Sequence, residues 1–333
     1  MTRPTAEVAA SGSAGRPGTW RAVAVLVLVA LAALVPLLGP SVALRGTGEA
    51  AAPGVGGIAL LRGVLFVALC VPAGELFVDR LVCRLPDAPP ERPANWAVFA
   101  AAAGFVAALG LASVVSTGNL VPRSLADIDV GGLYGSRDGR LALVEVNAFL
   151  LAGLCARSRR PATQVWPLAA VAVAEALRAH PAPEHSPLLG SALTLVHLSC
   201  ATLWAGGLLH ALRMLRRWRG REAGAALLGL YARVAAVLLA AVTATGVWSS
   251  LRRMPAGTVL DQLTTTAYGR TLLAKVILVA AVALLALWAR YRLRRAPDPL
   301  TAYVPARAEV AVLGVVVTVS GVLTALPLPI RWT

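Results

Sequence analysis

The stretch LLGSALTLVHLSCATLWAGGLLHAL, residues 188–212, contains no Asp, Glu, Lys or Arg. About 20 mostly apolar residues in a helix cross the hydrocarbon core of a bilayer, so this stretch predicts a transmembrane helix. Small residues let membrane helices approach closely. We therefore expect Gly206 and Gly207 here, and Gly246 in the next apolar stretch, to serve helix packing.

The whole chain has the composition of a membrane protein. Its 333 residues are 58% hydrophobic and only 14% charged, and the mean hydropathy is +0.72. A soluble domain is about half apolar and a quarter charged. These values exclude a water-soluble globule, a disordered chain and a disulfide scaffold.

Nine stretches are apolar enough to span a membrane, which predicts an all-α polytopic membrane helix bundle of about nine transmembrane helices. They are residues 20–38, 58–78, 96–115, 141–156, 165–179, 188–212, 226–251, 271–288 and 310–326. The fifth is the weakest, because Pro167 and Glu175 interrupt it. We interpret the first as a retained anchor, because it exceeds a signal-peptide core and no Ala-x-Ala cleavage site follows.

The basic residues predict the orientation. The chain has 31 Lys and Arg against 16 Asp and Glu. With a cytoplasmic N-terminus, nineteen basic residues fall in cytoplasmic segments and nine outside. The positive-inside rule therefore favours an N-inside, C-outside bundle in the lipid bilayer, and the excess charge requires no nucleic acid. An eight-span alternative would place one half of the chain against this rule.

No segment outside the spans is long enough for a globular domain. We divide the chain into a cytoplasmic tail at 1–19, an N-terminal membrane half of about five spans at 20–182, and a second membrane domain of about four spans at 183–333.

We single out seven charged residues within the expected spans or close to their ends, where charges are costly and usually find partners. The outer half holds Arg62, Glu145, Glu175 and Lys275, and the inner half holds Glu75, Arg233 and Glu309. We predict ion pairs within each set, with Glu309–Arg233 as one candidate. The predicted structural or gating charges are Lys275, Glu309, Arg233 and Glu175. Snorkelling to the interface is the alternative.

Three histidines lie near the predicted outer face. His180 ends the fifth stretch, His185 lies in the next loop, and His197 is roughly 13 Å down the sixth helix. Cys200 shares the face of His197. Imidazole and thiolate suit copper or zinc, so these residues predict a soft-cation site. A purely interhelical hydrogen bond at His197 remains open, and His210 is predicted to be interfacial.

Several motifs occur in a fixed order. They are His185, Leu195-Val-His197, Leu203-Trp-Ala-Gly-Gly-Leu208, Ala244-Thr-Gly246, Thr266-Ala-Tyr-Gly-Arg-Thr-Leu-Leu-Ala-Lys275 and Arg307-Ala-Glu309. Together they resemble the copper resistance protein D (CopD) family, over residues 185 to 327. The matching positions are His185, His197, Trp204, Gly206, Gly207, Tyr268, Lys275 and Glu309.

The resemblance implies a bacterial inner-membrane, multi-pass protein that imports or transfers copper from the outer face and contributes to copper homeostasis or resistance. His185 and His197 would contact the copper ion, with Cys200 and His180 as weaker additions. Because no copper-binding domain is fused to the chain, a separate extracytoplasmic donor protein is a possible partner.

Two other functions remain open. One is a membrane assembly or structural factor without transport. The other is a heme b redox protein, which needs two axial histidines on facing helices, whereas only His197 is well placed within a span. We do not expect an enzyme, because no Ser/His/Asp set, catalytic carboxylate pair or phosphate loop stands out.

Overall fold

The computed structural model describes residues 17–120, 124, 129–181, 184, 186–218, 222–254, 257–295 and 303–328. In these ranges the chain forms helices and loops, without a strand. The helices are α1 (Pro17–Leu44), α2 (Val55–Val82), α3 (Ala97–Thr117), α4 (Val130–Gly135), α5 (Arg137–Arg157), α6 (Val165–Arg178), α7 (Pro187–Arg217), α8 (Glu222–Arg253), α9 (Val259–Thr265), α10 (Ala267–Arg295) and α11 (Tyr303–Ala325), with the 3₁₀ turn η2 (Pro161–Gln164).

The prediction of an all-α polytopic membrane bundle is confirmed. Among the described residues, seven helices are long and apolar enough to cross a membrane: α2, α3, α5, α7, α8, α10 and α11. The first predicted span lies within α1, and the fifth corresponds to α6. At 14 residues, α6 is about 21 Å long, shorter than a hydrocarbon core of about 30 Å. The number of crossings and the orientation therefore stay predictions.

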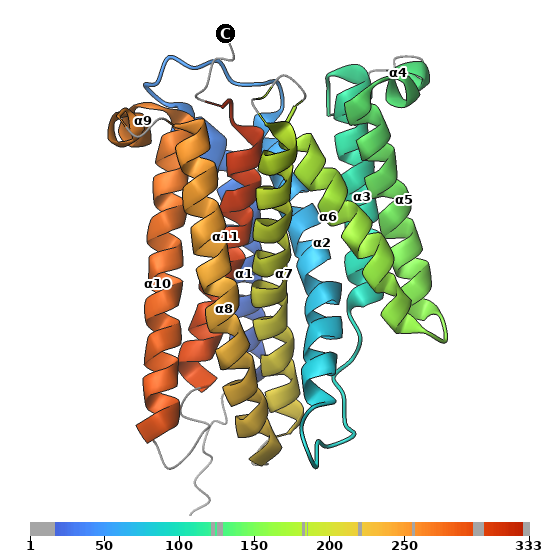
Figure 1. Ribbon diagram of the computed structural model, residues 1–333, viewed down its shortest axis with the longest axis vertical. Coiled ribbons are helices and arrows are strands. Elements are labelled where there is room, and N and C mark those ends of the chain that lie inside the picture. The colour runs from blue at the N-terminus through green and yellow to red at the C-terminus, as the bar shows by residue number, and fades with distance from the viewer. Residues whose placement is uncertain are drawn as a thin grey trace, which may run out of the picture.

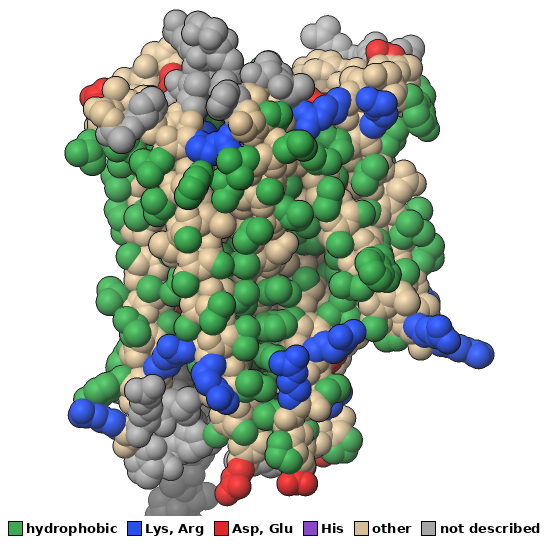
Figure 2. Space-filling view, in the orientation of Figure 1, with side chains coloured by type: hydrophobic (Ala, Val, Ile, Leu, Met, Phe, Trp, Pro, Cys, Tyr) green, Lys and Arg blue, Asp and Glu red, His purple; other side chains and the backbone are tan. Residues whose placement is uncertain are grey.

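The long helices run up and down along one axis, and α1 begins at the opposite end from the end of α11 (Figure 1). Figure 2 shows apolar side chains covering the middle of the visible face, with Lys and Arg gathered above and below them. This distribution fits a bilayer, because long basic side chains reach the headgroup regions from the helix ends.

Helix α2 is the centre of the bundle. It packs against α1, α3, α7 and α11, and more weakly against α6 and α8. Helices α3, α5 and α6 group on one side of it, and α7, α8, α10 and α11 on the other (Figure 1). The predicted boundary at 182/183 falls between α6 and α7, but α2 from the first half packs closely on the second half. The division into two halves stays a prediction.

Glycine pairs set the close approach of α2 to its neighbours. A β-carbon on Gly206 of α7 would collide with the Cys70 carbonyl oxygen of α2, and one on Gly74 would collide with the backbone of Gly206. Nearer the other end of α2, a β-carbon on Gly321 of α11 would lie 2.6 Å from the Ala59 carbonyl oxygen and 3.0 Å from Gly63 Cα. The backbones of α7 and α11 therefore contact α2 at two depths.

We expect Gly206→Ala to lower the free energy of unfolding by about 2–3 kcal/mol, because the added methyl group forces α7 away from α2. Thermal unfolding of the purified protein in detergent measures this loss. Gly314→Ala in α11 is the matched control, because no atom lies within 4 Å of its β-carbon position. Equal stability of the two variants would contradict the packing role of Gly206.

Candidate functional site

One face of α7 carries His197, Cys200 and Trp204, whose spacing of three and four residues aligns them along the helix. His197 Nδ1 lies 3.0 Å from Thr245 Oγ1 of α8. A β-carbon on Gly246 would lie 3.3 Å from His197 Cε1, so this glycine leaves room for the imidazole. The structure thus places His197 between α7 and α8.

The hydrogen bonds of Thr245 favour one tautomer of His197. The Thr245 hydroxyl donates to the Ala241 carbonyl oxygen at 2.7 Å, so it accepts a hydrogen bond from His197 Nδ1–H. In that tautomer Nε2 carries a lone pair, and the Val242 backbone carbonyl is a further acceptor within hydrogen-bonding reach of the ring. A histidine that ligates a metal commonly has this arrangement, in which the other ring nitrogen donates to a fixed oxygen.

Lys275 of α10 lies close enough to His197 to interact with it electrostatically. Its side chain is half-buried, and no acidic residue in the described part of the chain forms an ion pair with it. Arg253, whose Nη1 donates to the Tyr268 hydroxyl at 3.1 Å, is a second nearby cation. The region around His197 is therefore basic.

A cavity of about 250 Å³ lies further along, between α7, α8, α10 and α11. The Glu309 carboxylate is buried in its wall, within hydrogen-bonding reach of the Trp204 side chain and near Arg290. The Tyr231 hydroxyl donates to the Trp204 carbonyl oxygen at 2.6 Å, and Gly207 leaves space for the Tyr231 ring. The Trp-Ala-Gly-Gly stretch of α7 thus brings α7, α8 and α11 together around one carboxylate.

The predicted Glu309–Arg233 pair is wrong. Arg233 is exposed on the outer face of α8, whereas Glu309 is buried and faces the cavity. Arg290, which follows the predicted stretch 271–288, lies beside Glu309 instead. The reason is that α10 continues to Arg295, beyond the apolar stretch, and this extension carries Arg290 into the helix bundle.

His180 is engaged on both ring nitrogens. Its Nδ1 lies 2.5 Å from Glu184 Oε2, and its Nε2 lies 2.8 Å from Thr194 Oγ1. Burial lowers the pKa of His180, although the Glu184 carboxylate opposes this shift. A neutral ring then donates from Nδ1 to Glu184 and accepts from Thr194 at Nε2, so neither nitrogen is free for a metal ion.

The structure does not bring the four predicted metal ligands together. His185 lies outside the described residues, and Cys200 packs among apolar side chains. In the part of the chain that the structure describes, no three His, Cys, Asp or Glu side chains form a group that could hold a metal ion. The metal site stays a prediction, with His197 the described member whose geometry suits a ligand.

The outer-half charges form buried ion pairs across α2, α5 and α6. Arg62 Nη1 lies 2.6 Å from both oxygens of Glu175, as the depth argument predicted for this set. Arg178 Nη2 lies 2.9 Å from Glu145 Oε1. Arg178 lies within the fifth predicted stretch but is not among the seven charges expected there; α6 carries it three positions after Glu175. This three-residue spacing places Arg178 on the same face of α6 as Glu175, and it is the sequence signal that Arg178 belongs to the buried ion pairs.

His210 packs inside the bundle, and its predicted interfacial depth in the bilayer stays a prediction. His210 is buried, 3.8 Å from Glu75 Oε1 and 3.7 Å from Asp79 Oδ1, because these two acids on α2 face α7. Glu75 also pairs with Arg213 at 2.7 Å and accepts from the Trp96 backbone N–H at 3.0 Å.

The positions of His197 and His210 also bear on heme binding. His197 faces α8 and His210 faces α2, about 20 Å apart along the same helix. This separation does not suit the two axial ligands of one iron.

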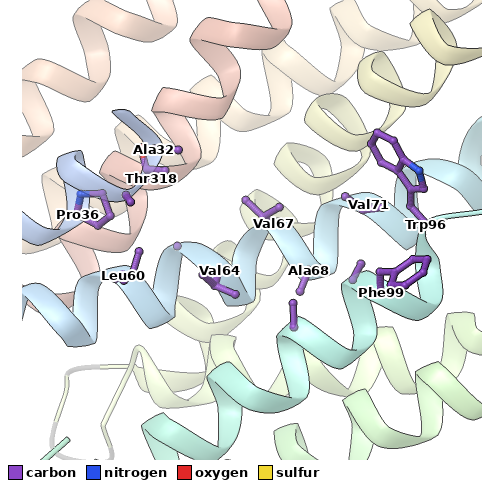
Figure 3. Close-up of a pocket in the computed structure, with 14 residues that line it drawn as sticks. Ala32, Pro36, Leu60, Val64, Val67, Ala68, Val71, Trp96, Phe99 and Thr318 are labelled. Carbon is purple, nitrogen blue, oxygen red and sulfur yellow. The ribbon is translucent and has the colours of Figure 1, made fainter. Parts of the chain in front are cut away.

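A larger groove of about 620 Å³ lies between α1, α2 and α3 (Figure 3). Its lining includes Leu60, Val64 and Phe99, and among the described residues that line it none is charged and none is His or Cys. The hydroxyl of Thr318 donates to its own helix, at the Val315 carbonyl oxygen. This groove therefore offers no ligand for a metal ion.

Residues 225–323 match the family model described as Copper resistance protein D. The chain resembles this family over its last membrane helices. The match covers most of α8, all of α9 and α10, and most of α11, and it includes Gly246, Lys275 and Glu309. It begins after His197 and Cys200, so it is narrower than the resemblance expected over 185–327. No curated protein and no solved structure matches the chain.

Together with the seven apolar helices, the match indicates a multi-pass membrane protein related to copper resistance.

We expect Glu175→Gln to lower the free energy of unfolding by about 3 kcal/mol, because it leaves Arg62 buried without its carboxylate. Chemical unfolding in detergent measures this loss. Glu222→Gln is the control, because Glu222 is exposed in the first turn of α8. If both variants unfold alike, the Arg62–Glu175 pair has no structural role.

We expect the melting temperature to fall between pH 7.5 and pH 5, and to fall less in His180→Gln. Because the folded-state pKa of His180 is lowered, its stabilisation is complete above the unfolded pKa of about 6.5 and is lost as the pH falls. Parallel thermal scans of the two proteins measure the difference, and identical pH profiles would refute it.

Proposed function

We propose that this protein imports copper across the bacterial inner membrane, or transfers it from the outer face, and thereby contributes to copper homeostasis or resistance. The observation that carries the proposal is the His197 imidazole, held at Nδ1 by Thr245, on a face of α7 that leads past Cys200 to the Glu309 cavity. The match to the copper resistance protein D family supports copper as the cargo.

His197 and Cys200 are one helical turn apart and supply an imidazole and a thiol, which are soft enough for copper. Two ligands hold a soft cation only transiently, and a transported ion must leave each site it visits. His185, in the loop that precedes α7, would receive the ion first. His180 would support the entrance from its hydrogen bonds to Glu184 and Thr194.

Lys275 and Glu309, the charged residues along the proposed copper route, would control the passage of the ion. Lys275 beside His197 repels further cations, so its displacement or deprotonation would favour entry of copper. The Glu309 carboxylate, in the cavity nearer the predicted cytoplasmic end, would attract the ion away from His197. Glu175 and Arg233 lie outside this route and have structural roles in the proposal.

Copper would arrive from a separate extracytoplasmic donor protein. In the orientation that the basic residues favour, the His197 end of α7 lies towards the outer face, where such a donor would dock.

The test is cell-associated copper in a null strain that carries the wild-type gene or a variant. We expect His197→Ala and Cys200→Ser to lower copper content and copper sensitivity to the level of the null strain. Ser199→Ala and Cys83→Ser are the matched controls. Ser199 lies on the α7 face towards α2 and α6, and Cys83 is exposed at the end of α2.

Membrane levels of each variant are measured by immunoblot, so that loss of transport is separated from loss of protein. Unchanged copper content in His197→Ala, at normal protein level, would contradict transport through this face. That outcome would favour the assembly-factor alternative.

A further inference from the structure

A second groove, of about 340 Å³, lies between α2, α6 and α7. Helix α6 meets α7 near the upper loop and diverges from it towards the lower end of the bundle (Figure 1). The space between them is lined mainly by apolar side chains, including Leu69, Leu76 and Phe77 of α2, Leu168 and Ala172 of α6, and Leu203 of α7.

The groove has the length of one membrane leaflet. On α2 its lining extends from Leu69 to Arg80, a rise of about 16 Å. Half of a hydrocarbon core of about 30 Å is about 15 Å. The apolar part therefore accommodates an extended chain that begins at the lower end of the bundle and reaches the bilayer centre.

Basic side chains surround the lower end of this groove. Arg80 lines it and is exposed, and Arg84 follows one turn later. Arg159 and Arg160 are exposed directly before η2, whose Ala162 also lines the groove. None of these four arginines forms an ion pair with an acidic residue in the described part of the chain.

The nearest acid in sequence does not neutralise Arg80. Asp79 points towards His210 of α7, with Arg92 4.0 Å from its carboxylate. The end of the groove thus combines an apolar channel with an unneutralised guanidinium. An amphiphile with an anionic head and an apolar chain complements both features.

We propose that the groove between α2, α6 and α7 binds one anionic phospholipid, with an acyl chain in the groove and its phosphate at Arg80. Arginine suits this role because its planar guanidinium donates two parallel hydrogen bonds to a phosphate. Basic pockets between membrane helices on the cytoplasmic side bind anionic headgroups in the same way. The bound acyl chain would fill the space that opens between α6 and α7 where the two helices diverge.

The test is native mass spectrometry of the full chain, purified in detergent and mixed with phosphatidylglycerol or with phosphatidylcholine of the same acyl chains. We expect one phosphatidylglycerol per protein. Arg80→Gln should weaken its retention about tenfold, the loss of one charge-assisted interaction. Arg295→Gln, an exposed arginine at the same end on α10, should retain the lipid as the wild type does.

A second variant tests the apolar channel. Ala169 lines the groove and is exposed, so Ala169→Phe fills the channel without a change of charge and should abolish lipid retention. Melting temperatures in lipid-free detergent control for folding of each variant.

Three results would overturn the proposal. The first is that Arg80→Gln retains phosphatidylglycerol as well as the wild type does. The second is that Arg295→Gln loses as much lipid as Arg80→Gln, which would indicate a diffuse electrostatic attraction between the basic surface and the lipid. Displacement of the lipid by an equal concentration of inorganic phosphate would show that the arginines bind phosphate without the acyl chain.

Discussion

The backbone contact between Gly74 of α2 and Gly206 of α7 is the constraint on which the other interactions depend. In a bilayer, lipid chains are as apolar as leucine, so association of helices relies on close van der Waals packing and on polar contacts. Two glycines without side chains allow that packing. Once α7 is fixed against α2 in this rotation, its remaining faces point towards α8, α11 and the space beside α6.

The same central helix organises the buried charges. Arg62 of α2 pairs with Glu175 of α6, and Glu75 of α2 pairs with Arg213 of α7. The Arg62–Glu175 pair lies in the N-terminal half of α2, and the Glu75–Arg213 pair lies in its C-terminal half. The two pairs join α2 to different neighbouring helices. Since an unpaired charge in a membrane is costly, each pair selects one rotation of its partner helix. Close packing and ion pairing thus specify the same arrangement.

The two proposed sites use different faces of α7. The His197 and Cys200 face turns towards α8 and belongs to the copper route, whereas Ser199 and Leu203 turn towards α2 and α6 and line the lipid groove. Because the faces are separate, a substitution in one leaves the side chains of the other in place. The copper proposal and the lipid proposal therefore stand or fall independently.

The sequence by itself determined the all-α membrane class and the positions of the seven long apolar helices, because hydrophobic length is a local property of the chain. Depth along each helix also grouped Arg62 and Glu175 in one set of expected ion pairs, without naming the partners. Only the tertiary structure decided that Arg178 meets Glu145, that Arg290 replaces Arg233 beside Glu309, and that His210 is buried. These outcomes depend on where each helix ends and on its rotation and tilt, which are set by packing against its neighbours.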